Sequence, residues 1–221
     1  MNETVHRAKA GAGRDSGRTN DPERTRADIV DVATQEFSEK GLAGARIDEI
    51  AAATRTSKRM IYYYFGNKEG LYLAVLEESY RRMREAEAQL ALDDLDPVNA
   101  LRRLIEFTFD HHRQDERHVR LIMSENIARG QYLAQSPTLT TLNAPVIDRL
   151  RRLYQRGVDA GVFRAGLDPL DLHASLSALA FFNVSNEYTF GLAFGIDMRC
   201  EAYAAQRRAS VVDMVLRHVC A

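Results

Sequence analysis

Three Asp-Pro pairs divide the chain into segments that each open with the signature of a helix start: Asp21-Pro22, Asp96-Pro97 and Asp168-Pro169. An aspartate can cap the free N–H groups of a first helical turn, and a proline at the first helical position gives up no hydrogen bond. After each pair, apolar residues recur at intervals of three and four, the period of a helix that buries one face. No alternating pattern of useful length indicates a strand, and the chain has no internal repeat. The sequence therefore predicts an all-α protein.

The segment after the first pair carries a helix-turn-helix pattern. Gly41 is expected to end the first helix, Ser57 to cap a third helix that turns Ile61 and Phe65 inward, and Asn67 to cap a fourth. The expected helices cover about residues 22–40, 47–53, 58–64 and 68–90. Two short helices joined by a turn and braced by a preceding helix form the helix-turn-helix pattern, here a three-helix headpiece.

The remaining chain is also predicted to be helical. Apolar residues at helical spacing follow Pro97, Pro145 and Pro169, and Gly161 is expected to stop the segment that Pro145 opens. Two further helices are expected over about residues 116–128 and from about residue 201. The fold class is thus an N-terminal headpiece followed by a larger helical domain.

The charge of the chain is nearly balanced but locally uneven. The 221 residues hold 30 Lys and Arg against 31 Asp and Glu, a formal net charge of -1. Residues 54–68 nevertheless carry Arg55, Lys58, Arg59 and Lys68, no acidic residue, and three consecutive tyrosines. A local cationic patch on a nearly neutral chain favours a defined docking site for phosphate groups.

The sequence also narrows the compartment and the class of protein. No run of about 18 apolar residues could span a membrane, and the first 20 residues have no apolar core of a secretory signal. With only two cysteines, Cys200 and Cys220, a disulfide framework is not expected; buried structural thiols are favoured over a redox switch. We therefore expect a cytoplasmic protein with no membrane partner.

The stretch "FSEKGLAGARIDEIAAATRTSKRMIYYYFGNKEGLYLAVLEE" resembles the DNA-binding domain of the TetR family of transcriptional regulators, over about residues 24–77. The resemblance implies that the third helix enters the major groove of DNA. It places Lys58, Arg59 and Tyr63 toward the DNA and Tyr62 and Tyr64 beside the backbone. The residues that carry the resemblance are Phe37, Gly41, Ile50, Ala51, Ser57, the block from Ile61 to Phe65, Lys68, Glu69 and Leu71.

Physical chemistry supports these roles. A tyrosine hydroxyl can donate to a phosphate while its ring packs on a sugar or a thymine methyl group. Lys68, at the start of the fourth helix, can meet a phosphate together with the helix N-terminus. Arg46, Asp48 and Ser57, at the starts of the second and third helices, complete the candidate DNA-binding residues.

The chain departs from the family pattern at two positions. The family usually has Thr or Ser where this chain has Ala45 and Arg46, and Gly where it has Arg55. An arginine in a left-handed turn costs ~1 kcal/mol. These departures bear on how bases are read rather than on the assignment to the family.

Three segments follow from this interpretation: a disordered tail over residues 1–21, a DNA-binding domain over 22–68, and an effector-binding and dimerisation domain over 69–221. The basic residues of the tail are expected to be solvated, with a minor-groove arm as the alternative. They are Arg7, Lys9, Arg14 and Arg18.

The expected function is a ligand-responsive transcriptional repressor that binds a pseudo-palindromic double-stranded operator as a homodimer. The resemblance implies a four-helix interface from the last two helices of each subunit, and two stripes have suitable spacing: Leu172/Leu176/Leu179 and Val211/Val215/Val219. The alternative is a DNA-organising helix-turn-helix protein without an effector. An enzyme is not expected, because no nucleophile elbow, Gly-rich phosphate loop or firmly spaced metal motif occurs.

Candidates for the effector pocket come from segments dense in Phe, Asn and His, which could line a cavity or could equally form core and subunit interface. They are Phe107, His111, Met123, Asn126, Phe182, Asn183 and Asn186. His111, Asp115 and His118 have the spacing of a metal site, but exposed polar residues at a helix end are the favoured interpretation. We expect no metal and no cofactor.

Overall fold

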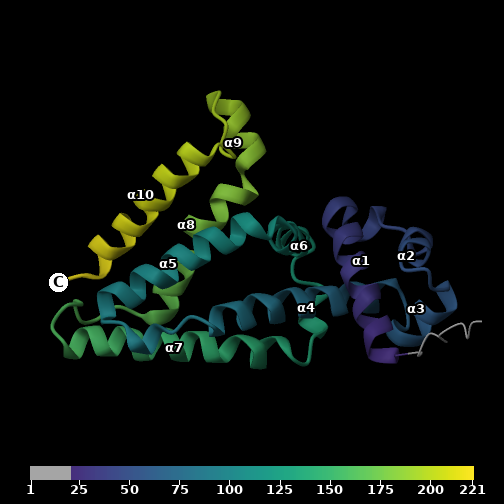
Figure 1. Cartoon of the computed structure of the whole chain (residues 1–221), viewed down its shortest axis with the longest axis horizontal. Helices are drawn as coiled ribbons and strands as arrows, with labels where there is room; N and C mark the ends of the chain where they lie inside the picture. Colours follow the sequence, from purple (N-terminus) through teal and green to yellow (C-terminus); the bar gives the residue numbers. More distant parts are fainter. Residues whose placement is uncertain (1–20) are drawn as a thin grey trace, which may run out of the picture.

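The computed structural model describes residues 21–221, and within them the chain forms ten α-helices and no strand (Figure 1). The helices are α1 (Pro22–Gly44), α2 (Ile47–Ala53), α3 (Lys58–Phe65), α4 (Lys68–Ala88), α5 (Pro97–Gln114), α6 (Glu116–Ile127), α7 (Leu139–Asp159), α8 (Pro169–Ser185), α9 (Glu187–Phe194) and α10 (Glu201–Val219). The prediction of an all-α fold is confirmed. Of the helices described, none combines the length and the apolar character needed to cross a membrane. The predicted tail falls outside the described residues, apart from Asp21.

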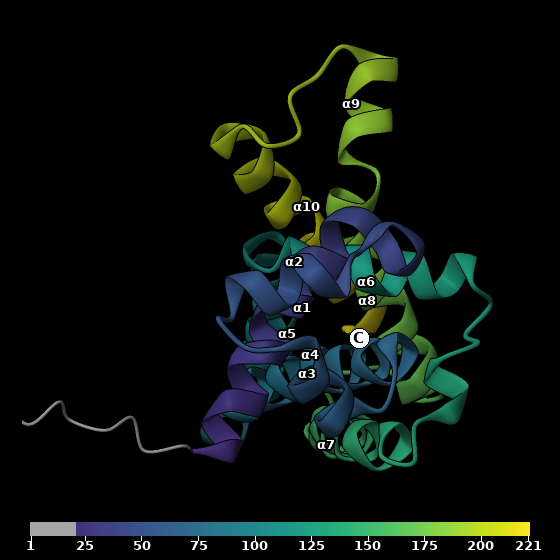
Figure 2. The ribbon, with the colours of Figure 1, turned by 90° about the vertical axis from the view of Figure 1, so that its right-hand side faces the viewer.

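The headpiece lies at one end of the molecule, where α1 and α3 pack against α4 and α2 packs against α1 and α3 (Figures 1 and 2). Its hydrophobic core takes buried residues from all four helices and also Leu121 from α6. Fully buried members include Phe37, Ile50, Ile61 and Leu71. The rings of Phe37 and Tyr72 meet edge to face at 5.1 Å, which fixes α1 against α4.

The body of the protein has a second core, built from α5, α7, α8 and α10. Leu101, Ile105 and Phe109 on α5 face Leu150 on α7 and Leu176 on α8 inside this core. The C-terminus lies at the end of the molecule opposite the headpiece (Figure 1). Helix α4 runs from the headpiece into the body, so it is the continuous element that joins the two ends (Figure 1).

Four of the predicted helix starts are confirmed by their caps. Asp21 accepts hydrogen bonds from the first turn of α1, and Asp96 accepts from the Asn99 N–H. Ser57 accepts from the Met60 N–H at 3.2 Å. Asn67 accepts from the Gly70 N–H at 2.7 Å. These side chains satisfy donors that a helix cannot pair internally, so each fixes the residue at which its helix begins.

Pro145 does not open a helix, contrary to the prediction. Helix α7 begins at Leu139 and contains Pro145 in its second turn. The reason is an earlier cap: Ser136 Oγ accepts from the Leu139 N–H at 3.1 Å and donates to Glu77 on α4 at 2.6 Å. This tertiary contact starts the helix before the proline.

The two stripes assigned to a dimer interface are also placed differently. Leu172, Leu176, Val211, Val215 and Val219 are all buried in the core of their own subunit, with Leu179 packed against it. Their spacing marks the inner faces of α8 and α10, which pack on α5. An interface built from α8 and α10 would therefore have to use their outward faces. Helix α9 was not predicted as a separate element.

Gly70 is expected to be essential to the corner between α3 and α4. A Cβ atom at this position would lie 2.1 Å from the backbone carbonyl oxygen of Phe65, so Gly70→Ala must force the two helices apart. We expect the free energy of unfolding to fall by about 1–3 kcal/mol, measured by urea denaturation. Gly44→Ala is the control, since its Cβ would meet only the Lys40 side chain at 3.3 Å. Equal stability of the two variants would contradict this account of the corner.

Candidate functional site

One buried side chain anchors α3 and leaves its other faces outward. Ile61 is 0% exposed in the headpiece core, whereas Tyr62 is 44% exposed and Tyr63 is 78% exposed. Successive residues on a helix point about 100° apart, so the anchor determines the direction of its neighbours. Tyr64 is half-buried and its ring meets that of Tyr63 edge to face at 5.4 Å. The helix therefore presents aromatic rings to solvent from a rigid base.

Three cations lie at the starts of α2 and α3. Lys58 forms an ion pair with Asp48, both largely exposed, which ties the start of α3 to α2. Arg59 is exposed and has no carboxylate within 4.0 Å among the described residues. Arg46 lies at the start of α2, 3.9 Å from Glu49. Arg59 is thus the guanidinium on α3 that is available to an anionic partner.

Lys68 lies at the N-terminus of α4, beside the capping residue Asn67. Its Nζ donates to the Ala43 carbonyl oxygen at 3.4 Å, a long bond that a phosphate could replace. The N-terminus of a helix attracts anions through its unpaired N–H groups. The side chain of Ser57, by contrast, is occupied by capping α3.

The turn between α2 and α3 has the strained residue that the sequence indicates. Arg55 adopts a φ of 53°, the left-handed region that a side chain disfavours. The turn is closed by the Thr56 N–H, which donates to the Ala51 carbonyl at 3.1 Å. Phe65 is half-buried rather than fully inward, and the Arg26 guanidinium lies 5.2 Å from the centre of its ring.

A polar contact and an aromatic contact together connect α6, through the segment that follows it, to the headpiece. Buried Glu125 accepts the N–H groups of Tyr132 and Leu133 at 2.7 and 2.9 Å. The ring of Tyr132 in turn meets Tyr72 of α4 edge to face at 5.3 Å. Burial, and then the neighbouring carboxylate, raises the pKa of Tyr72 to about 12. A movement of α6 must therefore disturb the core of the headpiece.

Of the three residues expected to be exposed at the junction of α5 and α6, His118 is buried, whereas His111 and Asp115 are partly buried. His112 and His118 are each 4% exposed, and Ser79 Oγ bonds His118 Nδ1 at 2.7 Å. Burial, reinforced by the neighbouring imidazoles, lowers the pKa of His112 to about 3. Burial likewise lowers the pKa of His118 to about 4. Helix α5 ends before Asp115, so the regular spacing of a metal site is interrupted there.

The residues predicted for an effector pocket are spread over several places. Phe107 and His111 stack on α5 at 5.3 Å, and Phe182 meets Phe190 near α9. Met123 lines a cavity of about 340 Å³ between α1, α6 and α8, whereas Asn183 lines a smaller one of about 160 Å³. Asn126 is exposed, and Asn186 lies between α8 and α9.

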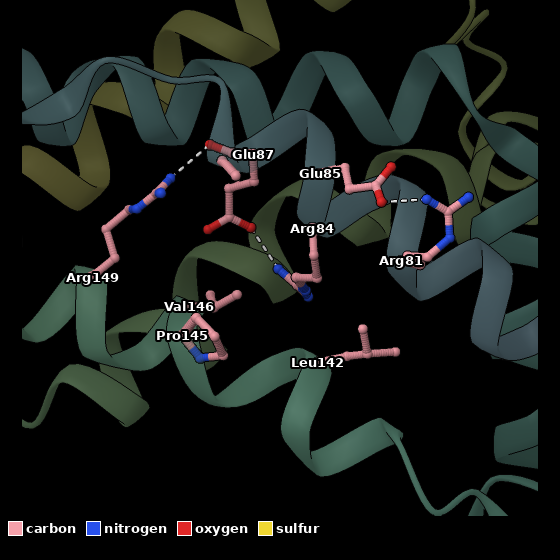
Figure 3. A pocket seen from close by; sticks show the side chains of 9 residues that line it. Arg81, Arg84, Glu85, Glu87, Leu142, Pro145, Val146 and Arg149 are labelled. Carbon is pink, nitrogen blue, oxygen red and sulfur yellow. Dashed lines mark hydrogen bonds and ion pairs between the residues drawn. The ribbon is translucent and has the colours of Figure 1, made fainter.

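Sequence reasoning missed a cavity of about 240 Å³ between α4 and α7 (Figure 3). Its lining includes Arg81, Arg84 and Arg149, whose charges suggest a solvated helix face when read from the sequence alone. The available signal was three arginines within one turn of α4, at positions 81, 82 and 84. Sequence reasoning also expected buried thiols, but Cys200 is exposed.

Comparisons with known proteins agree over both parts of the chain. Residues 29–75 match the family described as "Bacterial regulatory proteins, tetR family", and residues 97–215 match "Tetracyclin repressor-like, C-terminal domain". The chain is 32% identical over 200 residues to the HTH-type transcriptional repressor NicS of Pseudomonas putida, covering 90% of this chain and 94% of that protein. It is 38% identical over 110 residues to the HTH-type transcriptional repressor SCO4008 of Streptomyces coelicolor, covering 50% of this chain and 54% of that protein.

Solved structures show the same fold. The structure of SCO4942 from Streptomyces coelicolor superposes with a TM-score of 0.67 at 31% identity, covering 88% of this chain and 98% of that one. A bacterial regulatory protein in the tetR family from Rhodococcus RHA1 superposes with a TM-score of 0.69 at 20% identity, covering 90% and 98% of the two chains.

The buried histidines predict a loss of stability in acid. An imidazole in the unfolded chain takes up a proton near pH 6.5, whereas His112 in the folded protein does so only at about 3. The unfolded state therefore binds more protons between these values, and the free energy of unfolding falls as the pH is lowered. Each such histidine contributes a slope of up to about 1.4 kcal/mol per pH unit below its unfolded pKa. His112→Asn should reduce this slope in urea denaturation from about pH 7 to about pH 5; an unchanged slope would show that His112 is not kept neutral by the fold.

Proposed function

The chain belongs to the TetR family of transcriptional regulators, and from this premise we propose that it is a repressor that releases an operator when a small molecule binds. The relatives NicS and SCO4008 are named repressors, which supports repression over activation. The similarity to named repressors also favours an effector-controlled regulator over a DNA-organising protein. A regulator of this kind works in the cytoplasm with the chromosome and carries out no catalysis.

The observation that carries the proposal is the outward face of α3. Tyr62, Tyr63 and Arg59 are exposed on a helix held by the fully buried Ile61. Two adjacent exposed rings beside a guanidinium that has no carboxylate partner within residues 21–221 add no stability to a monomer. A helix that enters the major groove, by contrast, needs such groups to contact DNA. We assign base contacts to Arg59 and Tyr63.

The surrounding residues position this face on the backbone. We assign phosphate contacts to Lys68 at the N-terminus of α4 and to Arg46 at the start of α2. The ion pair between Lys58 and Asp48 holds α2 and α3 together, so the two side chains act as one unit. Ser57 contributes through its cap. Tyr62 and Tyr64 flank the contact as ring surfaces.

Two copies of the headpiece would be presented by a homodimer. Leu172 and its stripe are internal, so we propose that the outward faces of α8 and α10 form the four-helix interface. On α8 this face is formed by Ala174, Ala178 and Phe182, which are exposed at intervals of four. Small residues at this spacing let helices approach closely across a two-fold axis.

The connection through α4 indicates how the chain divides into a DNA-binding unit and an effector-binding unit. We propose that residues 22–68 form the DNA-binding unit and residues 69–221 the effector-binding and dimerisation unit. Only two residues separate the end of α3 from the start of α4, and α4 lies against α7 in the body. A ligand that changes the packing of α4 on α7 would therefore change the spacing of the two α3 helices in a dimer.

Substitutions at Lys68 and Tyr63 should weaken DNA binding in different ways. Lys68→Ala removes a phosphate contact, so it should weaken binding to operator and random DNA alike and lower the salt slope by about one unit. Tyr63→Ala removes ring contacts but no charge. It should leave the salt slope unchanged and narrow the preference for operator by about 1–3 kcal/mol. The measurement is fluorescence anisotropy on both DNAs across a salt series.

Phe65→Ala serves as the control for these variants. The Phe65 ring packs on the headpiece core, so its removal should lower thermal stability instead of acting on DNA contacts directly. If Lys68→Ala and Tyr63→Ala both retain full affinity for operator while melting as the parent does, α3 is not the DNA-reading element.

The dimer makes a separate prediction. Ala178→Glu places a carboxylate on the outward face of α8, where an interface would bury it unpaired, so the variant should be monomeric. Ala144→Glu, on an exposed position of α7, should remain a dimer like the parent. Size-exclusion chromatography with light scattering distinguishes the two species. A parent protein that is a stable monomer, or two variants that behave alike, would remove this interface.

A further inference from the structure

The cavity between α4 and α7 has a charged roof and an apolar floor (Figure 3). Helix α4 contributes the charged side chains, and α7 contributes Leu142, Pro145 and Val146 together with Arg149. Its volume of about 240 Å³ is below the ~300–1,000 Å³ typical of pockets for drug-sized ligands. The space therefore suits a small molecule with one polar end.

The charged side chains that line the cavity come from both helices, and all but one are paired with a neighbouring charge. The Arg84 guanidinium bonds Glu87 at 2.5 Å and Asn143 at 2.9 Å. Arg81 is paired with Glu85. Arg149 has no carboxylate within 4.0 Å among the described residues, and its Nη1 donates to the backbone carbonyl oxygen of Glu87 at 2.9 Å. The side of the cavity nearest Arg149 thus carries an uncompensated positive charge.

Nearby groups do not cancel this charge. The two glutamates of the cavity, Glu85 and Glu87, are already engaged by arginines. A cationic ligand would have to break one of these ion pairs, whereas an anion needs only the free donors of Arg149.

We propose that this cavity binds a small monocarboxylate with a hydrocarbon body, and that this molecule is the effector. The carboxylate takes the remaining guanidinium donors of Arg149, and the hydrocarbon lies on Leu142, Pro145 and Val146. Arginine is suited to this task because its planar fork matches both oxygens of a carboxylate. The inference rests on the proposed function for its role as effector, but binding itself does not depend on it.

The position of Arg149 explains how binding would be transmitted. Its bond to the Glu87 carbonyl joins α7 to the last turn of α4, the helix that continues into the headpiece. A carboxylate bound to the remaining donors pulls the guanidinium toward the cavity and so weakens this bond. A weaker bond loosens α4 from α7 at the end opposite to α3, so the ligand and the operator favour different placements of α4.

The test uses hexanoate and benzoate as probes, with hexanamide and benzamide as neutral partners of the same shape. Calorimetric titration of the full chain should show binding of the carboxylates, with each amide weaker by about tenfold or more. Arg149→Gln should reduce carboxylate affinity by about tenfold or more and leave amide affinity unchanged. Arg152→Gln, an exposed arginine on the same helix that does not line the cavity, is the matched control and should bind as the parent does.

Two readouts separate this inference from the proposed function. Operator affinity without any probe tests the regulator itself, and release of operator by hexanoate or benzoate tests the effector role. The inference is overturned if no carboxylate binds, if acid and amide bind equally to the parent, or if Arg149→Gln binds the acids as the parent does. If Arg149→Gln does not fold, the comparison of carboxylate with amide binding by the parent protein still tests whether the cavity selects a carboxylate. If the protein binds these acids but binds no operator, the proposed function is refuted, whereas the carboxylate-binding site is supported.

Discussion

The burial of the first half of α4 in the headpiece is the interaction on which the rest of the structure depends. Leu71, Tyr72, Val75 and Leu76 are almost fully buried in the headpiece core, and each contributes roughly 1.5–3 kcal/mol by leaving water. Since α4 continues without a break to Ala88, its far end is positioned by the same packing. The headpiece cannot rotate on the body without moving the helix that also roofs the cavity. A single helix thus connects the headpiece, with the proposed DNA-reading helix α3, to the cavity proposed to bind the effector.

Much of this fold can be predicted from local chemistry. Asp21, Ser57 and Asn67 are caps that need only the next few residues, and the period of the apolar residues identifies Ile61 as the anchor of α3. What local chemistry cannot give is the effect of a distant partner. Ser136 starts α7 early because Glu77 on another helix holds it, and no pattern near Pro145 reports that contact.

The same distinction between local sequence and distant contacts applies to the candidate functional sites. The outward face of α3 follows from one anchor and a helical period, so its rings and cations can be located from the sequence. The cavity cannot, because the contact of Arg84 with Asn143 and the lack of an ion pair for Arg149 within residues 21–221 depend on how α4 meets α7. For the same reason the stripe headed by Leu172 could be recognised as apolar, but not as internal rather than between subunits.

The account stands on the claim that two α3 helices, related by a two-fold axis, read DNA together. Selection of bound sequences from random duplex DNA by the intact protein tests this most directly. The account predicts an enriched inverted repeat whose half-sites are centred about one helical turn of 10–10.5 base pairs apart, or a multiple of it. Recovery of no enriched sequence, or of a single half-site without its inverted copy, would contradict it.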